Sequence, residues 1–299
     1  MRSLRTACDL AFLGHMCLDE VVPFDGEPHV APGSAVLCGA LAAARVGKRV
    51  AVVTRMAQKN EEILEPMRRA GVAVHLVPAL STTYMKVVHP SADVDDREMI
   101  QLASAGRFSA ADIPDLNARQ VHLAGITDQE FDLDFVRAMK ARGYRVSADM
   151  QSFVRQVDPA THRITFGDVP DKAELVGLLD MVKLDVVEAK VLTGTDDLER
   201  AALRFEEWGS PETLITRADG VLARVNGKTY WEQFTNRSVV GRTGRGDTMF
   251  AAYMARRLDY DAEESLRFAS ALVSLKMERA GPFNGTITDV LDRMAEAAS

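Results

Sequence analysis

The sequence predicts an α/β fold in which a mostly parallel sheet is covered by helices on both faces. Short apolar segments typical of buried strands alternate along the chain with longer segments of helical periodicity. Glycine ends two of the helical segments, at Gly47 and Gly71. Regular strand–helix alternation indicates parallel pairing, because parallel strands need a crossover connection and helices provide it. With 299 residues and no long linker, residues 1–299 are expected to form one domain.

The first part of the chain contains three expected strands and two expected helices. Ser34 is the expected N-cap of the first helix, because its hydroxyl can accept a hydrogen bond from the first helical turn. In order, these elements are a strand at 9–14, a helix at 34–47, a strand at 49–54, a helix at about 60–70 and a strand at 72–77.

Two segments interrupt this alternation, at 19–32 and 83–104. Both contain strand-like runs separated by turn residues. We expect them to form a small antiparallel patch that stands off the main sheet and acts as a lid. An open edge of this patch would allow a homodimer to form.

The alternation resumes after this interruption and ends in a helical region. The expected elements are strands at 120–125, 144–149, 181–184, 213–217, 221–225 and 228–234, and helices at 129–142, 186–193, 196–208, 246–258, 261–278 and 286–298.

Composition excludes several classes of protein. The net charge is −7 and no block of Lys or Arg offsets it, which argues against nucleic-acid binding. No apolar run is long enough to span a membrane, and Asp9 interrupts the short apolar segment near the N-terminus, which favours a strand over a signal peptide. Cys8, Cys17 and Cys38 have no CxxC spacing, so we expect a reduced, cytoplasmic protein.

The most informative motif is GRTGRGDT at 241–248, a glycine-rich turn that opens a helix. Glycines let the backbone approach an anion, and a helix N-terminus offers unpaired N–H groups and a positive dipole end. Asp247 beside such a phosphate site could take the proton of an attacking hydroxyl. The turn lacks the P-loop lysine and the GxGxxG spacing. The alternative is a loop-to-helix junction in which Asp247 is a simple cap.

The segment GRTGRGDTMFAAYMARRL resembles the C-terminal signature of the ribokinase-like (PfkB-type) carbohydrate kinases, and the resemblance covers nearly the whole chain in matching order. It implies a three-layer α/β/α sandwich with a small β-strand lid. It also implies that Asp247 is the general base and that the backbone N–H groups of Gly244, Arg245 and Gly246 form an anion hole. The implied cofactors are ATP and Mg²⁺.

A second matching segment, LDVVEAKVLTG at 184–194, resembles the NxxE-containing segment of the family. It places Asp185 at the asparagine and Glu188 at the glutamate. Both lie one turn apart at the start of a helix, where Glu188 could organise Mg²⁺, usually through water. The alternative is that the two acidic residues only complement the helix dipole.

The N-terminal part is implied to bind the phosphate acceptor. GHMCLDEVV at 14–22 places Asp19 where a carboxylate of the family binds substrate hydroxyls, although a surface turn aspartate is the alternative. PGSAVLCGALAAARVG resembles a further signature, with Gly33, Ser34 and Cys38 at the paired glycines and the asparagine. Gln151 follows a strand end, where an open α/β sheet presents ligand contacts, and is a weaker candidate for this pocket.

The C-terminal part is implied to bind the nucleotide. TLITRADG at 213–220 matches a segment that flanks it, which suggests Thr216 and Gly220 near ATP. Residues 269–283 lie where the family closes over adenine.

Three residues of the signature depart from the family pattern. Gly241 replaces the aspartate that helps to hold a monovalent cation in many members, which argues against potassium activation. Arg242 and Arg245 replace small, uncharged residues. Either one of them supplies positive charge to the phosphates, or both point to solvent.

The predicted function is therefore ATP-dependent phosphorylation of a hydroxyl group on a sugar or polyol. One alternative is a nucleoside kinase with the same mechanism. The other is a catalytically silent protein that binds a ligand or regulates a partner. The retention of Asp247 and Glu188 argues against this second alternative.

Overall fold

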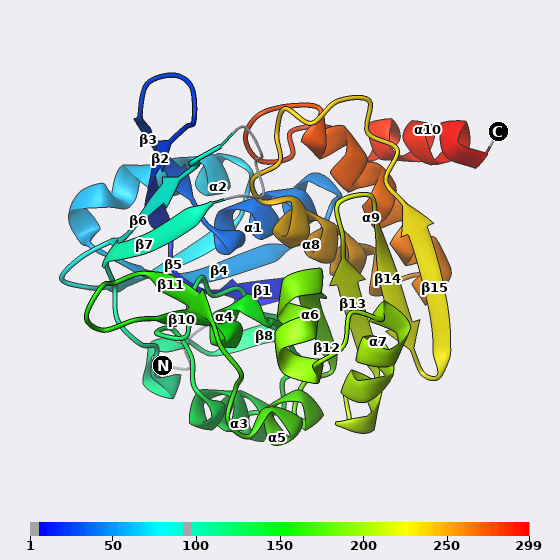
Figure 1. Cartoon of the computed structure of the whole chain (residues 1–299), viewed down its shortest axis with the longest axis horizontal. Coiled ribbons are helices and arrows are strands. Elements are labelled where there is room, and N and C mark those ends of the chain that lie inside the picture. The colour runs from blue at the N-terminus through cyan, green and yellow to red at the C-terminus, as the bar shows by residue number, and fades with distance from the viewer. Residues whose placement is uncertain (1–5, 92–96, 299) are drawn as a thin grey trace.

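A nine-stranded sheet runs through the centre of the molecule in the computed structural model, which describes residues 6–91 and 97–298 (Figure 1). Seven neighbouring strands are parallel and the last two are antiparallel, so the prediction of a mostly parallel sheet is confirmed. In order across the sheet, the strands are β15 (Lys228–Gln233), β14 (Gly220–Val225), β13 (Glu212–Thr216), β12 (Met181–Asp185), β9 (Val146–Asp149), β8 (Leu116–Leu123), β1 (Thr6–Leu13), β4 (Val50–Met56) and β5 (Ala73–Pro78).

Helices cover both faces of this sheet and make a three-layer molecule. Strand β1 explains the arrangement, because its side chains alternate between the two faces: Leu10 and Phe12 belong to one apolar core, and Ala11 and Leu13 to the other. The first core is closed by α1 (Ala35–Arg45), α2 (Glu65–Arg69), α8 (Arg245–Arg257), α9 (Ala262–Met277) and α10 (Ile287–Ala298). The second is closed by α3 (Leu133–Ala141), α4 (Gln151–Val154), α5 (Lys172–Gly177), α6 (Val186–Thr193) and α7 (Leu198–Glu207).

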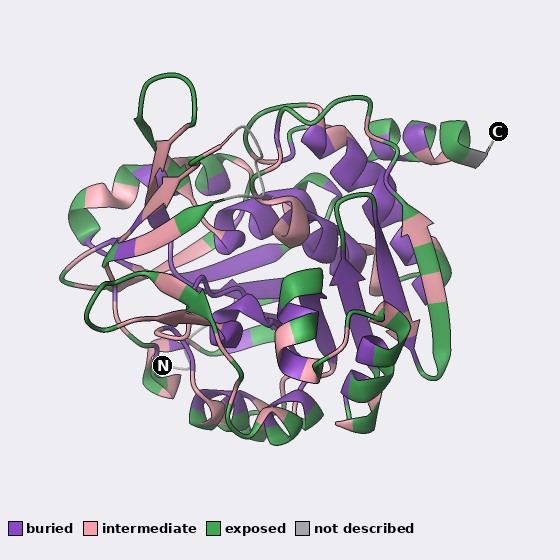
Figure 2. Ribbon diagram, viewed as in Figure 1, coloured by how far each residue is buried: buried purple, intermediate pink, exposed green. Residues whose placement is uncertain are grey.

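Burial follows this layering. The central strands are buried along most of their length, whereas β15 at the sheet edge has only exposed and half-buried residues (Figure 2). No helix within residues 6–91 and 97–298 combines the length and the apolar composition that crossing a bilayer requires.

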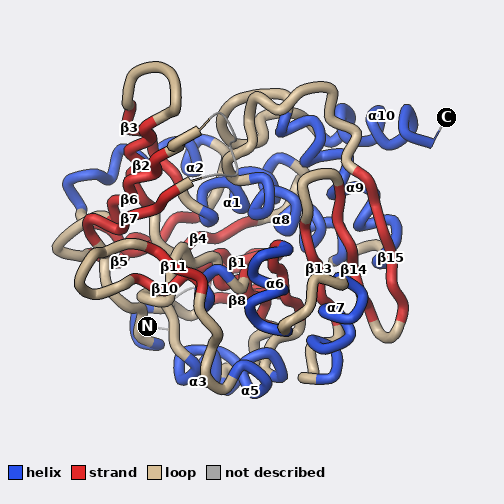
Figure 3. Tube along the Cα trace, in the orientation of Figure 1, coloured by secondary structure: helices blue, strands red, loops and turns tan. Residues whose placement is uncertain are grey.

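A second, four-stranded sheet stands beside the main one (Figure 3). Its strands, in order, are β3 (His29–Gly33), β2 (Cys17–Val22), β6 (Thr83–Val88) and β7 (Glu98–Ala103). The expectation of a purely antiparallel patch is wrong, because the central pair, β2 and β6, is parallel. Both strands continue from strands of the main sheet, β1 and β5, and leave the same edge in the same direction.

His15 joins the two sheets. Its Nδ1 lies 2.8 Å from the Thr83 hydroxyl of β6, and its Nε2 lies 2.8 Å from the Gly106 carbonyl oxygen. Because a carbonyl only accepts, Nε2 must carry the proton, and Nδ1 accepts from Thr83. Burial lowers the pKa of His15, although the charge of Glu130 opposes this effect. A neutral His15 therefore fixes the small sheet to the edge where β1 ends.

Several elements differ from the sequence prediction. The helix expected at 129–142 begins only at Leu133, because Asp132 is its N-cap and accepts from the Phe135 N–H. The helix expected at about 60–70 is the 3-10 helix η1 (Gln58–Leu64) followed by α2. Four short elements between residues 151 and 177 were not predicted, namely α4, β10 (Arg155–Val157), β11 (Ile164–Phe166) and α5. A further short 3-10 helix is η2 (Ala110–Asp112). Ser34 is the N-cap of α1, as expected.

Candidate active site

Polar side chains gather where the parallel strands of the main sheet end. Asp149 is the last residue of β9, Asp185 of β12 and Thr216 of β13. These strands are parallel neighbours, so their carboxyl ends lie on one edge, where open α/β sheets bind ligands. Gly246 in the first turn of α8 lies against Lys183 of β12, so the N-terminus of α8 is at the same edge.

The turn at 244–247 leaves the start of α8 open. Gly244 is the N-cap in a left-handed conformation, with φ of 76°, and no side chain caps this end. The first N–H groups of an α-helix have no partner inside the helix, so they can bind an anion. The Arg245 N–H already donates to the Arg242 carbonyl oxygen at 3.1 Å and closes the turn. Of the three N–H groups that the sequence suggested, this one is therefore already engaged.

Both glycines of the turn have close neighbours. A methyl group on Gly244 would overlap the Cys38 sulfur of α1. A methyl group on Gly246 would lie 2.8 Å from Nζ of Lys183. The turn thus packs directly against the sheet and α1, and larger residues would displace it.

Asp247 lies in the first turn of α8 and is half-buried. Burial raises the pKa of this carboxyl group, and the neighbouring charge of Asp149 raises it further. The positive charges of Lys183, Arg155 and Lys276 oppose the rise. A carboxylate whose pKa is raised above its usual range is a better proton acceptor than an exposed one.

Lys183 and Asp149 form a buried ion pair beneath the turn. Lys183 of β12 donates to Asp149 at 2.8 Å, and only 4% of Lys183 is exposed. Burial alone would lower the pKa of Lys183, but the charges of Asp149, Glu188 and Asp247 together raise it. Sequence reasoning missed Lys183. The available signal was a lysine inside an apolar strand, because a buried lysine needs a partner.

Asp185 and Glu188 form a capping box at the start of α6. Asp185 accepts hydrogen bonds from the N–H groups of Val187 and Glu188, and Glu188 Oε2 accepts from the Asp185 N–H. Glu188 is fully buried, and its second oxygen, Oε1, has no hydrogen-bond partner. Arg155 Nη2 lies 3.5 Å from this oxygen. Burial and the charge of Asp185 raise the pKa of Glu188 to about 8.

Glu188 Oε1, which has no hydrogen-bond partner beside its ion pair with Arg155, fits a divalent cation or a water molecule bound to one. No group of three or more His, Cys, Asp or Glu side chains among the described residues has the arrangement of a metal site. Mg²⁺ does not need such a cage, since it commonly uses one or two carboxylates, water and the phosphates of its substrate. The residues present therefore fit a magnesium ion that arrives with a phosphate donor.

The residues expected to bind the acceptor come from β2, β3, α1 and α4. Asp19 of β2 accepts from the Cys17 thiol at 2.7 Å, and burial raises the pKa of its carboxyl group. Gly33 of β3 lies against this carboxylate, where any side chain would overlap it. Arg97 precedes β7, and its positive charge opposes this rise in the Asp19 pKa. Sequence reasoning missed Arg97.

Cys38, Ser34 and Gln151 have different surroundings. Cys38 is buried next to Gly244, and burial raises the pKa of its thiol to about 12, so it is uncharged. The Ser34 hydroxyl is occupied as the N-cap, because it accepts from the Leu37 N–H at 3.0 Å. Gln151 is buried and donates to the Gly125 carbonyl oxygen at 2.8 Å, which ties together the ends of β8 and β9.

The residues expected near the nucleotide lie on β13 and β14. Thr216 is buried, and its hydroxyl lies 3.4 Å from the Leu184 carbonyl oxygen. Gly220 is buried against β15, where a side chain would collide with Trp231. Arg245 reaches from the 244–247 turn to the Ala218 carbonyl oxygen, 3.5 Å away in the β13–β14 turn. Burial and the charge of Arg242 lower the pKa of Arg245 to about 10.

Lys276 holds the other side of the turn. It lies in the last turn of α9, is 2% exposed, and donates to the carbonyl oxygens of Gly241 and Thr243. Burial lowers the pKa of Lys276, and the charge of Asp247 opposes this effect. Sequence reasoning placed this segment over adenine and missed the lysine.

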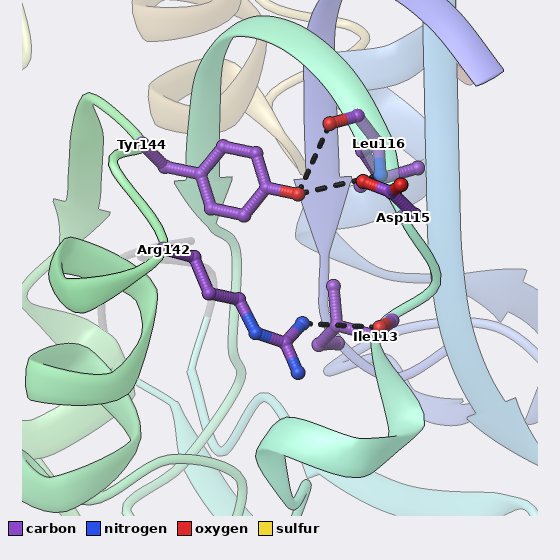
Figure 4. Close-up of a pocket in the computed structure, with 5 residues that line it drawn as sticks. All are labelled: Ile113, Asp115, Leu116, Arg142 and Tyr144. Carbon is purple, nitrogen blue, oxygen red and sulfur yellow. Dashed lines mark hydrogen bonds between the residues drawn. The ribbon is translucent and has the colours of Figure 1, made fainter. Parts of the chain in front are cut away.

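A cavity of about 410 Å³ lies elsewhere, lined by Ile113, Asp115, Leu116, Arg142 and Tyr144. The Tyr144 hydroxyl contacts the Leu116 backbone, and Arg142 donates to the Ile113 carbonyl oxygen (Figure 4). Leu116 begins β8 and Tyr144 precedes β9, so the cavity is at the amino end of these strands, opposite the site. It is not part of the candidate active site.

Comparison with known proteins identifies the family of the chain. A family model described as pfkB family carbohydrate kinase matches residues 12–289. A cytidine kinase of Thermococcus kodakarensis is 25% identical over 255 residues, covering 83% of this chain and 87% of that protein.

Two similar solved structures are pyrophosphate-dependent kinases in the ribokinase family. A sulfate complex has a TM-score of 0.87 at 30% identity, covering 94% of this chain and 99% of that chain. A complex with a pyrophosphate analog and myo-inositol has a TM-score of 0.86 at 28% identity, covering 95% and 99%. The three-layer fold with a mostly parallel sheet that the sequence predicts is thereby confirmed.

Proposed function

Since the chain belongs to the pfkB family of carbohydrate kinases, we propose that it transfers a phosphoryl group to a hydroxyl group of a small polyol or sugar, with Asp247 as general base. The observation that carries this proposal is the position of Asp247. Its carboxylate has a raised pKa and follows directly on the open N-terminus of α8. Phosphoryl transfer to a hydroxyl needs a proton acceptor beside a phosphate site, and these two features supply both.

In the proposed reaction, Asp247 accepts the proton of the acceptor hydroxyl group. At the same time, the oxygen of that hydroxyl group forms a bond to the transferred phosphorus. The bond between that phosphorus and the donor oxygen breaks, and the remaining donor leaves. The open N–H groups of the 244–247 turn stabilise the charge on the phosphoryl oxygens. The Lys183–Asp149 pair lies beneath the turn and fixes its distance from the sheet. The small sheet is proposed to close over the acceptor and exclude water.

Glu188 and Asp185 are the residues that would hold Mg²⁺, with Glu188 Oε1 acting directly or through water. Such an ion would supply positive charge to the donor phosphates. Arg155, 3.5 Å from the same oxygen, orients the carboxylate.

We propose pyrophosphate as the phosphate donor. Arg245 reaches from α8 to Ala218, within the 213–220 segment that the resemblance places beside a nucleotide. An arginine binds phosphate groups, so it suits a donor that places phosphate, rather than an uncharged nucleoside, beside Ala218. Two similar structures are of pyrophosphate-dependent kinases. ATP, the donor expected from the family resemblance, is the second candidate.

We propose a cyclic polyol of the inositol class as the acceptor. Asp19 offers a half-buried carboxylate that can accept hydrogen bonds from two neighbouring hydroxyl groups. One similar structure contains myo-inositol. A nucleoside is the second candidate acceptor, because one relative is a cytidine kinase.

The test is an assay of phosphoryl transfer with Mg²⁺ in which each donor, pyrophosphate or ATP, is combined with inositols, sugars and nucleosides. We expect turnover with pyrophosphate and an inositol, and a loss of about 100-fold to 10,000-fold in kcat for Asp247→Asn. Asp134→Asn is the matched control, because Asp134 also lies in the first turn of a helix, α3, but is exposed. Comparable turnover by Asp247→Asn would contradict the mechanism. Ligand binding without turnover for any donor would indicate the silent binding protein instead.

A further inference from the structure

We propose that the ammonium group of Lys276 is a built-in monovalent cation that positions the 244–247 turn, so that the protein needs no potassium ion. This inference rests on the proposed function, because it concerns the same anion-binding turn. Lys276 is a positioning residue in this scheme: it acts on the donor through the backbone of residues 241–243.

The contacts of Lys276 are with backbone oxygens. Its ammonium group donates to the carbonyl oxygens of Gly241 and Thr243, the residues that lead into the turn. The Gly241 N–H in turn donates to the Met277 carbonyl oxygen at 2.8 Å. The end of α9 and the start of the turn are thus joined in both directions.

Lys276 is buried without a carboxylate partner. Only 2% of the residue is exposed, and no ion pair joins it to a carboxylate among the residues that the structure describes. A buried charge that lacks such a partner is costly, so its presence calls for a compensating role. The carbonyl oxygens of Gly241 and Thr243 and the nearby charge of Asp247 provide the compensation.

Carbonyl oxygens are also the ligands that potassium ions use in proteins. An ammonium group is a compact point charge and can replace such an ion on the same oxygens. Gly241 packs so closely against the Arg279 carbonyl oxygen that no side chain fits at position 241. A carboxylate ligand therefore cannot come from this position, and the lysine supplies the charge instead.

The experiment compares activity in potassium, ammonium and tetramethylammonium salts. Wild-type activity should be the same in all three. Lys276→Ala should lose about 100-fold in kcat, since the turn is displaced, with a small change in KM for the acceptor. Potassium or ammonium ions should restore much of this loss, because the shortened side chain leaves room for them. Lys276→Met should lose as much and should not be restored, since its side chain fills that room.

The matched control is Lys172→Ala. Lys172 also donates to a backbone carbonyl oxygen, that of Leu192 at 2.7 Å, but it lies on α5 away from the turn. This variant should keep wild-type activity and show no response to potassium.

A second measurement separates this inference from the proposed function. Sulfate affinity, measured by calorimetry in the same salts, should not depend on potassium for wild type and should depend on it for Lys276→Ala. If no acceptor is phosphorylated, the proposed function fails, but the sulfate result still decides the role of Lys276. Potassium stimulation of wild-type activity or sulfate binding overturns the inference, even if Lys276→Ala does not fold. Full activity of Lys276→Ala without potassium also overturns it.

Discussion

At the scale of single residues, the protonation of Asp247 depends on its cationic neighbours. Burial raises the pKa of this carboxyl group, and Lys183 is the largest of the charges that lower it. A general base works only when deprotonated, so activity should be lost as the pH falls through the raised pKa of Asp247.

Lys183→Met should therefore move the acid limb of the pH–activity profile to higher pH. Removing the positive charge leaves Asp247 easier to protonate, so its pKa rises further. The measurement is kcat/KM against pH for wild type and variant. Lys140→Met is the control. Lys140 forms an ion pair with Asp180 at 2.7 Å, outside the site, so this variant removes a lysine from an ion pair without touching the site. An acid limb that stays in place, or moves to lower pH, would argue against Asp247 as the base.

Some of the charged residues at the site can be recognised from the sequence, and others become evident only in the structure. Asp247 and Glu188 can be recognised from local signals, because each lies in a motif at the start of a helix. Lys183 has one local signal, its place inside an apolar strand, and Lys276 has none inside its helix. Their roles come from long-range contacts with Asp149 and with the backbone of Gly241 and Thr243.

At the scale of elements, the glycines at helix ends differ in what surrounds them. Gly244 before α8 and Gly194 after α6 have nearly the same left-handed conformation, with φ of 76° and 74°. A methyl group on Gly244 would meet the Cys38 sulfur, whereas nothing lies within 4 Å of one on Gly194.

Gly194→Ala should cost only the backbone penalty of about 1–2 kcal/mol in the free energy of unfolding and leave activity unchanged. Gly244→Ala should cost more and reduce kcat, because the turn must move away from Cys38. Chemical denaturation and steady-state kinetics measure the two effects. Cys38→Ala should restore part of the stability of Gly244→Ala. Equal costs for the two glycine variants would show that the turn is not held against α1.

The helices and parallel strands could be predicted because each has its own pattern of apolar residues and its own end signals. Ser34 and Asp132 show the limits of such signals: both are N-caps, but only Ser34 was recognised. The pairing of β2 with β6 could not be predicted, because alternation along a strand is the same for parallel and antiparallel neighbours. The short elements between 151 and 177 are too brief to show any periodicity.

At the scale of the whole molecule, the link between the two sheets depends on a few buried hydrogen bonds. The Thr83 hydroxyl contacts His15 Nδ1 at 2.8 Å and accepts from the Ala105 N–H at 3.1 Å. Thr213 of β13 is equally buried, but its hydroxyl oxygen has no partner.

Thr83→Val should lower the free energy of unfolding by about 1–3 kcal/mol, because it leaves two buried polar groups without partners. Thr213→Val should change it by less than about 0.5 kcal/mol or increase it, because no hydrogen bond is lost. Urea denaturation of both variants measures the two free energies of unfolding. The change in side chain is the same in both variants. Similar losses for both would mean that the His15 link does not hold the sheets together.

The charges around the 244–247 turn also have an effect beyond the site. The chain as a whole carries a net charge of −7, yet Lys183, Arg155, Arg245 and Lys276 all act on this one edge of the sheet. These cations lie among the carboxylates of Asp149, Asp185, Glu188 and Asp247, so the edge has no excess of negative charge, unlike the rest of the molecule. An anion is therefore repelled less at this edge than elsewhere, and dissolved salt, which screens charge, reduces this difference.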